Sequence, residues 1–357
     1  MPSYEVETPQ RRYTAVVERG ILERAASLLP PPAGRTFVIT ERGVWERHCG
    51  RLAAALAGRS HEVLFYRGGE ENKRLAAVES LAEEMVCRGG DRSSLVIAFG
   101  GGVVTDVAGF VAAIFMRGIP VVQIPTTLLA QVDAAIGGKT GVDLACGKNL
   151  AGAFHQPLAV LIDPEVLSTL PEREYRAGLF EVLKCGIIRS PELFSLMAAE
   201  SAGVLARTPA IVDRLIAESV RIKAEVVSAD ERESGLRAIL NFGHTIGHAL
   251  EVETGYTRFL HGEAVGFGMR AATYLAERTG HLSAEHAVDI LNAIEAYGPI
   301  PPLNGVTPDA LVSRTLFDKK TLQGRVRFVL PVRIGEVKVV QGLDESVVRM
   351  AIQEAIG

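Results

Sequence analysis

The stretch LVIAFGGGVVTDVAG, residues 95–109, decides the fold class of this chain. Its first five residues are apolar without interruption, which is typical of a strand covered on both faces in a parallel sheet. Three glycines follow the strand, Gly100 to Gly102, and a helical pattern begins directly after them. Such glycines let the backbone approach a ligand, and the amino end of the next helix attracts anions. Because the G-x-G-x-x-G pattern is absent, the stretch alone favours a cofactor site no more than a tight turn.

The rest of the first half repeats this alternation between short apolar runs and helix-like stretches. Strands are predicted at residues 36–40, 63–66, 95–99 and 121–124, and helices at residues 44–56 and 75–88. Beyond residue 164 helical periodicity dominates, over residues 175–188, 191–206, 211–229, 239–253, 262–278 and 284–296, with short apolar runs at 326–330 and 337–340. We therefore predict an α/β N-terminal Rossmann-like domain with a parallel sheet, residues 1–163, and a mostly α-helical C-terminal domain, residues 164–357.

The composition excludes several classes of protein. The 357 residues contain 38 Lys and Arg against 42 Asp and Glu, without a basic cluster, so we expect no nucleic-acid partner. No uninterrupted apolar stretch reaches the roughly 20 residues that a membrane-spanning helix needs, and the amino-terminal residues lack an apolar signal core. The cysteines form no C-x-x-C pair, which argues against a disulfide framework or a cysteine zinc site. We expect a cytoplasmic protein whose partner is a small molecule.

Hydroxyl and basic groups follow a second predicted strand. Residues 121–124 run into Pro125, Thr126 and Thr127, which places two hydroxyl groups at the carboxyl edge of the sheet. Ligands of open α/β sheets bind along this edge. The next segment places Lys139 and Lys148 beside glycines in small, apolar surroundings. Such lysines are often only solvated surface residues, but the dense recurrence of glycine, lysine and aspartate favours an anion site.

Three of the eight histidines cluster in the second half of the sequence. His244 and His248 are four residues apart, which puts them on one helical face, and His261 follows. A metal site with an open position needs three protein ligands, and two histidines with a carboxylate satisfy this requirement. Glu181 is a candidate carboxylate, with Lys184 one turn later on the same face. The spacing predicts a metal site without deciding which of His244 and His248 is the ligand.

These motifs together closely resemble the 3-dehydroquinate synthase family of sugar phosphate cyclases. The resemblance extends from about Glu70 to Leu330. The matching motifs, in the family's order, are Gly-Gly-Gly-x-x-x-Asp, Pro-Thr-Thr-Leu-Leu-Ala, Ile-Gly-Gly-Lys-Thr, Gly-Lys-Asn, Glu-Val-Leu-Lys, Asn-Phe-Gly-His-Thr-x-Gly-His, His-Gly-Glu-Ala-Val and Asp-Lys-Lys. The resemblance implies a lyase that converts 3-deoxy-D-arabino-heptulosonate 7-phosphate to 3-dehydroquinate and phosphate in the shikimate pathway. The implied steps are transient oxidation by NAD, phosphate elimination, re-reduction and intramolecular aldol closure.

The resemblance also implies roles for individual residues. It implies NAD in the N-terminal domain and Zn²⁺ (or Co²⁺) in the C-terminal domain, with Glu181, His244 and His261 as metal ligands and His248 as a substrate or proton-transfer residue. The implied cofactor-binding residues are Glu70, Lys73, Gly101, Gly102, Val103, Asp106, Thr126, Thr127, Asp133, Lys139, Lys148 and Thr169. The residues implied to meet the substrate are Asp133, Lys139, Asn149, Lys184, Lys223, Arg237, Asn241, His248 and Lys319. Arg117 matches an arginine that reaches the neighbouring subunit's substrate phosphate, which implies a homodimer.

Three positions depart from the family's pattern. Glu41 stands where the family usually has Asp at the adenosine ribose, Thr105 replaces a frequent Gly, and His155 replaces a common aromatic residue. None of these changes removes a chemical group that the reaction needs.

Three alternative functions remain. They are another sugar phosphate cyclase, such as 2-deoxy-scyllo-inosose or valiolone synthase, a glycerol-dehydrogenase-like metal-dependent alcohol dehydrogenase, and an inactive NAD-binding protein. The sister cyclases characteristically alter the positions that pair with the substrate carboxylate, and here Arg237, Asn241 and Lys319 are all present. The phosphate-binding set argues against a dehydrogenase, and the complete constellation argues against an inactive protein. The resemblance therefore favours a dehydroquinate synthase.

Overall fold

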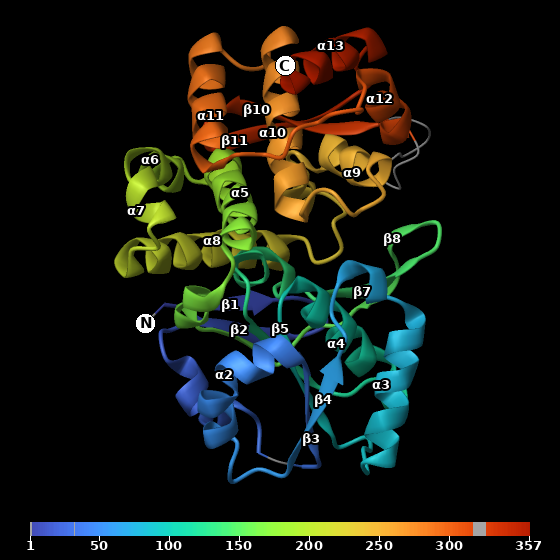
Figure 1. Cartoon of the computed structure of the whole chain (residues 1–357). Helices are drawn as coiled ribbons and strands as arrows, with labels where there is room; N and C mark the ends of the chain where they lie inside the picture. Colours follow the sequence, from blue (N-terminus) through green and yellow to red (C-terminus); the bar gives the residue numbers. More distant parts are fainter. Residues whose placement is uncertain (1, 32, 317–325) are drawn as a thin grey trace. The chain divides into compact units, whose positions relative to one another are not determined.

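The computed structural model of this chain describes residues 2–31, 33–316 and 326–357, which form two compact units (Figure 1). The first unit comprises Met1–Pro171 and Ile216–Arg232, and the second comprises Glu172–Leu215 and Glu233–Gly357. These units differ from the predicted domains by a few residues at the boundary and by a helical segment that belongs to the first unit. The predicted boundary between residues 163 and 164 separates a cofactor-binding domain from a metal-binding domain, and this functional division stays a prediction.

Seven strands form the main sheet of the first unit among the described residues, in the order β1-β2-β9-β6-β5-β3-β4. The pair β1–β2 is antiparallel and all other neighbours are parallel, which confirms the predicted parallel sheet. The strands are β1 (Ser3–Glu7), β2 (Arg12–Val17), β3 (Thr36–Glu41), β4 (His61–Tyr66), β5 (Leu95–Gly100), β6 (Val121–Pro125) and β9 (Ala159–Ile162). A separate antiparallel hairpin consists of β7 (Lys139–Leu144) and β8 (Gly147–Phe154).

Helices cover both faces of this sheet, which explains its uninterrupted apolar strands. The helical elements of the unit are η1 (Ile21–Arg24), α1 (Ala25–Leu28), α2 (Arg42–Ala55), η2 (Glu70–Asn72), α3 (Leu75–Cys87), α4 (Gly102–Ile114), η3 (Phe115–Arg117), the π-helical η4 (Ala130–Ala134) and η5 (Pro164–Thr169). Val96 and Ala98 of β5 pack in one core with α3 and α4. Ile97 and Phe99 pack in a second core with α2, because successive strand residues point to opposite faces.

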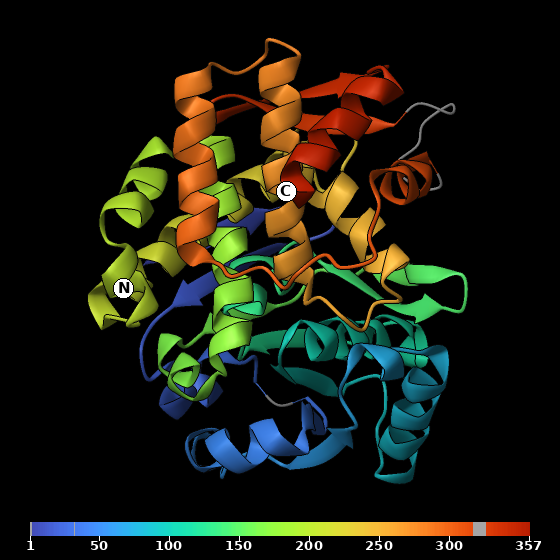
Figure 2. The same ribbon diagram turned by 45° about the horizontal axis from the view of Figure 1, so that its top comes forward.

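The second unit is mostly helical, as predicted. Its elements are α5 (Glu172–Arg189), α6 (Pro191–Ala199), α7 (Ser201–Leu205), η6 (Leu236–Asn241), α9 (His244–Glu253), α10 (His261–Arg278), α11 (Ala284–Tyr297), α12 (Pro308–Leu316), β10 (Arg327–Arg333), β11 (Glu336–Gln341) and α13 (Glu345–Ile356), while α8 (Pro209–Ala229) is shared between the units. Helix α10 packs against α5, α9, α11 and α13, and Figure 2 shows α10 and α11 side by side. Among the described residues, no helix combines the length and the apolarity that a bilayer crossing requires.

The structure differs from the predicted elements in a few places. The helix predicted at residues 191–206 is broken at Glu200, whose backbone leaves the helical region (φ −110°, ψ 26°). The helix predicted at residues 239–253 begins only at His244, because Gly243 takes a left-handed conformation with φ of 78°. Strands β1, β2, β7, β8 and β9 were not predicted, since several of them are short or carry exposed polar residues. The short apolar runs near the end of the sequence correspond to strands β10 and β11.

Candidate metal and cofactor sites

Three helices of the second unit bring Glu181, His244 and His261 together. Glu181 lies in the middle of α5, and the two histidines are the first residues of α9 and α10. The Glu181 side chain is 1 % exposed, that of His244 is 10 % exposed and that of His261 is 33 % exposed. The group is therefore a buried carboxylate with two imidazoles, one of which is open to solvent.

Glycines allow these helices to approach one another so closely. A Cβ atom at Gly262, the second residue of α10, would overlap the backbone carbonyl of Ala177 on α5. A Cβ atom at Gly268, two turns further along α10, would overlap the backbone carbonyl of Gly243 just before α9. Because both obstacles are backbone atoms, a larger residue at either position would force the helices apart and separate the three side chains.

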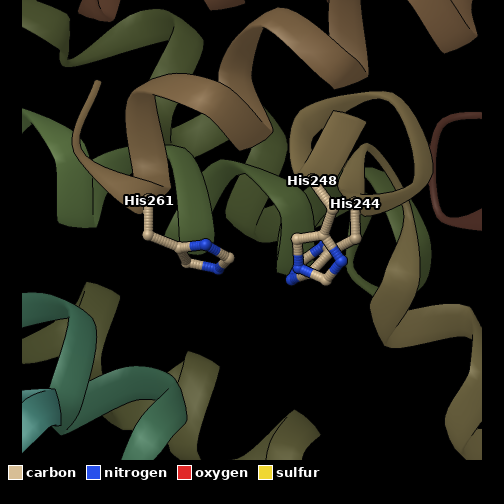
Figure 3. Close-up of side chains that lie close together, drawn as sticks. All are labelled: His244, His248 and His261. Atoms are coloured by element: carbon tan, nitrogen blue, oxygen red, sulfur yellow. The ribbon is translucent and has the colours of Figure 1, made fainter. Parts of the chain in front are cut away.

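The rings of His244, His248 and His261 face a common space (Figure 3). The centroid of the His244 ring lies 5.4 Å from that of His248 and 5.3 Å from that of His261. The centroids of the His248 and His261 rings are 5.8 Å apart. One ring nitrogen of each histidine lies within 4.8 Å of the corresponding nitrogens of the other two. The geometry thus keeps His248 beside the predicted ligands, as its position on the same face of α9 requires.

Hydrogen bonds at Nδ1 identify the tautomers of His244 and His261. Nδ1 of His244 lies 3.1 Å from the carbonyl oxygen of Phe242, and Nδ1 of His261 lies 3.3 Å from Oε2 of Glu251. A carbonyl and a carboxylate only accept hydrogen bonds, so in both rings Nδ1 carries the hydrogen. In a neutral ring the other nitrogen, Nε2, then presents a lone pair.

Both of these lone pairs converge on Glu181. Oε1 of Glu181 lies 3.8 Å from Nε2 of His244 and 3.8 Å from Nε2 of His261. Neither carboxylate oxygen of Glu181 accepts a well-oriented hydrogen bond, although the Lys184 ammonium forms an ion pair with Oε2. Ligands bound tetrahedrally at about 2.0–2.2 Å lie about 3.3–3.6 Å from one another, close to the separations observed here. Three converging lone pairs repel unless a cation lies between them, so these residues fit a divalent metal ion.

Two further predicted residues belong to the segment before α9. Arg237 in η6 is 1 % exposed, so its guanidinium lies inside the second unit. The side-chain amide of Asn241 donates a hydrogen bond to Glu233. A buried guanidinium is costly in free energy unless anions compensate it. The buried Arg237 therefore requires partners that compensate its charge.

Charged and polar side chains contact one another in the first unit, at or near the predicted cofactor positions. Lys73 is buried, and its ammonium donates hydrogen bonds of 2.6 Å to Asp106 and 2.6 Å to Asn149. The ammonium of Lys148 lies 3.1 Å from the carboxylate of Glu70. Burial lowers the pKa of Lys73, but the negative charges of Asp106 and Glu70 outweigh burial and raise it. Lys73 is thus a fixed positive charge that holds Asp106 and Asn149 in place.

The glycine turn lies at the carboxyl edge of the sheet, as predicted. Gly101 precedes α4, and Gly102 and Val103 are its first two residues, whose N–H groups have no partner within the helix. The backbone N–H of Thr126 donates to the carbonyl of the last residue of β5 at 2.9 Å. A Cβ atom at Gly101 would lie 3.0 Å from the methyl group of Thr127. The two threonines therefore stand directly beside the open amino end of α4.

Thr169 lies in η5, and its hydroxyl oxygen is 2.9 Å from Nε2 of His48 on α2. Burial, followed by the positive charges of Arg51 and Arg47, lowers the pKa of His48. The imidazole of His48 is therefore neutral near pH 7. His48 and Thr169 together offer uncharged hydrogen-bonding groups.

The three positions that depart from the family's pattern are accommodated locally. Glu41 is the last residue of β3, at the same edge of the sheet as the glycine turn. The hydroxyl of Thr105 donates to the carbonyl of Gly102 at 2.8 Å, within the first turn of α4. Nε2 of His155 lies 2.8 Å from the carbonyl oxygen of Ile119. None of these three residues forms one of these contacts with a predicted cofactor-binding side chain.

The family model for the N-terminal part of 3-dehydroquinate synthase matches residues 63–177, and the model for its C-terminal part matches residues 178–321. Together they cover more than half of the chain. The chain belongs to the 3-dehydroquinate synthase family. This membership confirms the resemblance that the sequence motifs indicated.

Individual members of the family and solved structures agree with this assignment. The chain is 65 % identical to 3-dehydroquinate synthase of Solibacter usitatus (strain Ellin6076), over 100 % of both chains. It is 29 % identical to ValA, the 2-epi-5-epi-valiolone synthase of Streptomyces hygroscopicus subsp. jinggangensis, solved with NAD⁺ and Zn²⁺, with a TM-score of 0.88 over 98 % of each chain. It is 25 % identical to a 2-deoxy-scyllo-inosose synthase complexed with carbaglucose-6-phosphate, NAD⁺ and Co²⁺, with a TM-score of 0.90 over 99 % of each chain.

The remaining family residues that the structure describes lie in the first unit. Asp133 forms an ion pair with Lys223, and Lys139 is exposed at the start of β7, all within the first unit. Arg117 is exposed in the turn after α4, where it adopts a left-handed backbone with φ of 73°. Lys319 lies outside the described residues.

Sequence reasoning missed two acidic residues near the histidines. Glu251 contacts His261, and Glu263 accepts two hydrogen bonds from Arg173 at 2.7 and 2.9 Å. The spacing of His244, His248 and Glu251 at i, i+4 and i+7 follows one helical face, so the pattern itself contained a signal for Glu251. Nothing comparable pointed to Glu263, whose partner lies 90 residues away in the sequence.

Proposed function

We propose that this protein is a 3-dehydroquinate synthase that requires NAD and a divalent metal ion, zinc or cobalt. Its reaction converts 3-deoxy-D-arabino-heptulosonate 7-phosphate to 3-dehydroquinate and phosphate. The convergence of Glu181, His244 and His261 in a chain of this family carries the proposal. NAD⁺ with Zn²⁺ or Co²⁺ in the solved sugar phosphate cyclases supports the choice of cofactors.

The bound groups divide the chemistry between them. NAD supplies a reversible hydride acceptor, and the metal ion supplies a Lewis acid that lowers the pKa of a coordinated alcohol. We assign the metal to Glu181, His244 and His261, which present the converging lone pairs. His248, beside them on α9, then holds a proton near the reacting hydroxyl group.

Within the first unit, the cofactor site combines a helix terminus with fixed charges. We assign NAD binding to the positions named above: Glu70, Lys73, Gly101, Gly102, Val103, Asp106, Thr126, Thr127, Asp133, Lys139, Lys148 and Thr169. The free N–H groups at the start of α4 suit the pyrophosphate of a dinucleotide. Lys73 and Lys148, each paired with a carboxylate, add ammonium donors to this part of the unit.

The proposed substrate carries a phosphate and a carboxylate, and each of these anionic groups needs positively charged side chains to bind it. We assign the phosphate to Lys139, Asn149, Lys184 and Arg117, and the carboxylate to Arg237, Asn241 and Lys319. The rest of the substrate is assigned to Asp133, Lys223 and His248. A guanidinium binds a carboxylate with two parallel hydrogen bonds, which is why a buried Arg237 favours this substrate over one without a carboxylate.

We further propose a cytoplasmic homodimer in which Arg117 of one subunit completes the phosphate site of the other. Met116 and Arg117 have left-handed backbones with φ of 50° and 73°. Such conformations cost free energy for residues other than glycine, on the order of 1–3 kcal/mol each, and persist where function requires them. Both side chains are exposed, so Arg117 is accessible to a neighbouring subunit.

The direct test is turnover with 3-deoxy-D-arabino-heptulosonate 7-phosphate, NAD and Zn²⁺. Phosphate release and the absorbance of NADH are followed together. We expect steady phosphate release without net NADH, abolished by a chelator and restored by Zn²⁺. Phosphate release only from glucose 6-phosphate or sedoheptulose 7-phosphate would identify a sister cyclase instead. Accumulation of NADH from simple polyols would identify an alcohol dehydrogenase.

A further inference from the structure

Glu251 occupies a costly position for a carboxylate. It lies in the last turn of α9, and its side chain is only 2 % exposed. Burial removes the water that would solvate its charge. The carboxyl end of a helix also carries partial negative charge, which repels a carboxylate in the last turn. A hydrogen-bond donor facing the carboxylate would offset part of both costs.

His261 provides such a donor. Its Nδ1 atom lies 3.3 Å from Oε2 of Glu251. The ring of His261 is 33 % exposed, so packing alone does not fix its orientation. His244 differs from it, because its ring is only 10 % exposed and its Nδ1 faces the backbone carbonyl of Phe242 at 3.1 Å. The more exposed ring therefore has the charged acceptor, and the buried ring has the neutral one.

The contact also joins two helices. Glu251 is on α9, seven residues after His244, whereas His261 begins α10. Residues at i and i+7 share a helical face. One face of α9 thus supplies one of the proposed ligands and also the group that orients a ligand on α10.

We propose that Glu251 is a positioning residue for the metal ion. Its carboxylate holds the Nδ1 hydrogen of His261 and keeps the Nε2 lone pair directed at the position beside Oε1 of Glu181. The proposal rests on the metal site described under the proposed function. Hydrogen bonding to a carboxylate also makes the imidazole a stronger ligand, and loss of such a partner typically weakens metal binding by about 10- to 100-fold.

The test compares two substitutions on the same helix. Glu251→Gln keeps the length and shape of the side chain and removes its charge. Glu253→Gln makes the same change two residues away, where the carboxylate pairs with Arg314 at 2.9 Å instead of with a histidine. The full-length proteins are titrated with Zn²⁺ against a competing chelator. We expect the Zn²⁺ dissociation constant to rise about 10- to 100-fold in Glu251→Gln and to stay at the wild-type value in Glu253→Gln.

Two additional measurements separate positioning from a general loss of stability. The visible absorption spectrum of the Co²⁺-loaded protein reports ligand geometry, and we expect it to change in Glu251→Gln only. The Glu251→Asp variant keeps the charge on a shorter side chain, so we expect it to recover part of the affinity that Glu251→Gln loses. Equal Zn²⁺ affinity and equal Co²⁺ spectra in folded Glu251→Gln and wild type would overturn the proposal.

The wild-type protein gives an independent answer even if a variant fails to fold. Nitrogen-15 NMR of the metal-free full chain, assigned with a His261→Asn variant, reports which ring nitrogen carries the hydrogen. We expect hydrogen on Nδ1 of His261, and hydrogen on Nε2 would contradict the proposal. Failure of the wild type to bind Zn²⁺, or full Zn²⁺ occupancy in His261→Ala, would instead contradict the metal site itself.

Discussion

The lone pairs of Glu181, His244 and His261 repel one another electrostatically unless a cation binds between them. Oε1 of Glu181 lies 3.8 Å from Nε2 of His244 and 3.8 Å from Nε2 of His261, while the ammonium of Lys184 pairs with Oε2 of the same carboxylate. A divalent ion held by these three proposed ligands would remove this repulsion. Loss of one ligand should therefore affect metal binding far more than it affects folding.

His261→Ala tests this expectation at the most exposed ligand. We expect loss of stoichiometric Zn²⁺ binding and of turnover, with NAD affinity unchanged because the predicted cofactor residues lie in the other unit. Metal content after dialysis and NAD titration by fluorescence measure the two effects. His286→Ala, on α11 outside the cluster, is the matched control and should keep its metal. Full metal occupancy in His261→Ala would show that the ligand set is wrong.

Arg237→Ala tests the proposed carboxylate site. A hydrogen bond between charged groups contributes about 1.5–3 kcal/mol, which corresponds to a loss of roughly 10- to 150-fold in kcat/KM. The loss should appear with the carboxylate substrate, while NAD and Zn²⁺ affinities remain at wild-type values. Steady-state kinetics and the two titrations measure these quantities. A variant with wild-type kcat/KM would exclude Arg237 from substrate binding.

At the scale of helices and strands, the beginnings of α9 and α10 position two residues of the proposed metal site. Gly243 ends the preceding turn in a left-handed conformation, so α9 starts at His244. Glu263 accepts the backbone N–H of Leu260 at 2.8 Å and two hydrogen bonds from Arg173 of α5, which fixes the start of α10. Both proposed ligands are the first residues of helices, and specific contacts hold these helix ends in place.

Gly268→Ala tests the close approach of α9 and α10. A methyl group at this position would overlap the backbone carbonyl of Gly243, which cannot move without displacing His244. We expect a loss of about 1–3 kcal/mol or more in unfolding free energy, together with weaker Zn²⁺ binding. Urea denaturation and Zn²⁺ titration measure both.

Gly50→Ala is the matched control, because the same substitution at this position creates no close contact. Gly50 is exposed in α2, and nothing lies within 4 Å of its Cβ position. Alanine favours a helix over glycine by about 0.5–1 kcal/mol, so this variant should gain stability. A loss of stability in Gly50→Ala, or none in Gly268→Ala, would contradict the account of helix packing.

At the scale of the whole molecule, ligands should stabilise the folded chain because they bind it and not the unfolded chain. Zn²⁺ at about 100 times its dissociation constant adds about 2.7 kcal/mol. For a unit of this size, that corresponds to a rise of roughly 5–10 °C in the melting temperature. Differential scanning calorimetry with Zn²⁺, and with a chelator, measures the shift. An unchanged melting temperature would contradict metal binding to the folded protein.

Much of the first unit follows from local sequence. The strands at residues 36–40, 63–66, 95–99 and 121–124 were predicted because their apolar runs match burial on both faces, and β3, β4, β5 and β6 occupy these positions. Strands β1 and β2 were not predicted. The edge strand β1 pairs only with β2, in antiparallel orientation, and β2 depends on its pairing with the distant strand β9. The break at Gly243 was also missed, since a single glycine does not reveal its backbone conformation.

The sequence by itself determined the family, the parallel sheet, the glycine turn and the candidate ligands, because motif order and periodicity are local properties of the chain. Only the tertiary structure decided which lone pairs converge and what holds them there. Glu181 and His261 are 80 positions apart, and their distance depends on helix packing that permits no Cβ atom at Gly262 or Gly268. The contact between Glu251 and His261 is likewise a consequence of that packing, because two helices must meet before a carboxylate on one can orient an imidazole on the other.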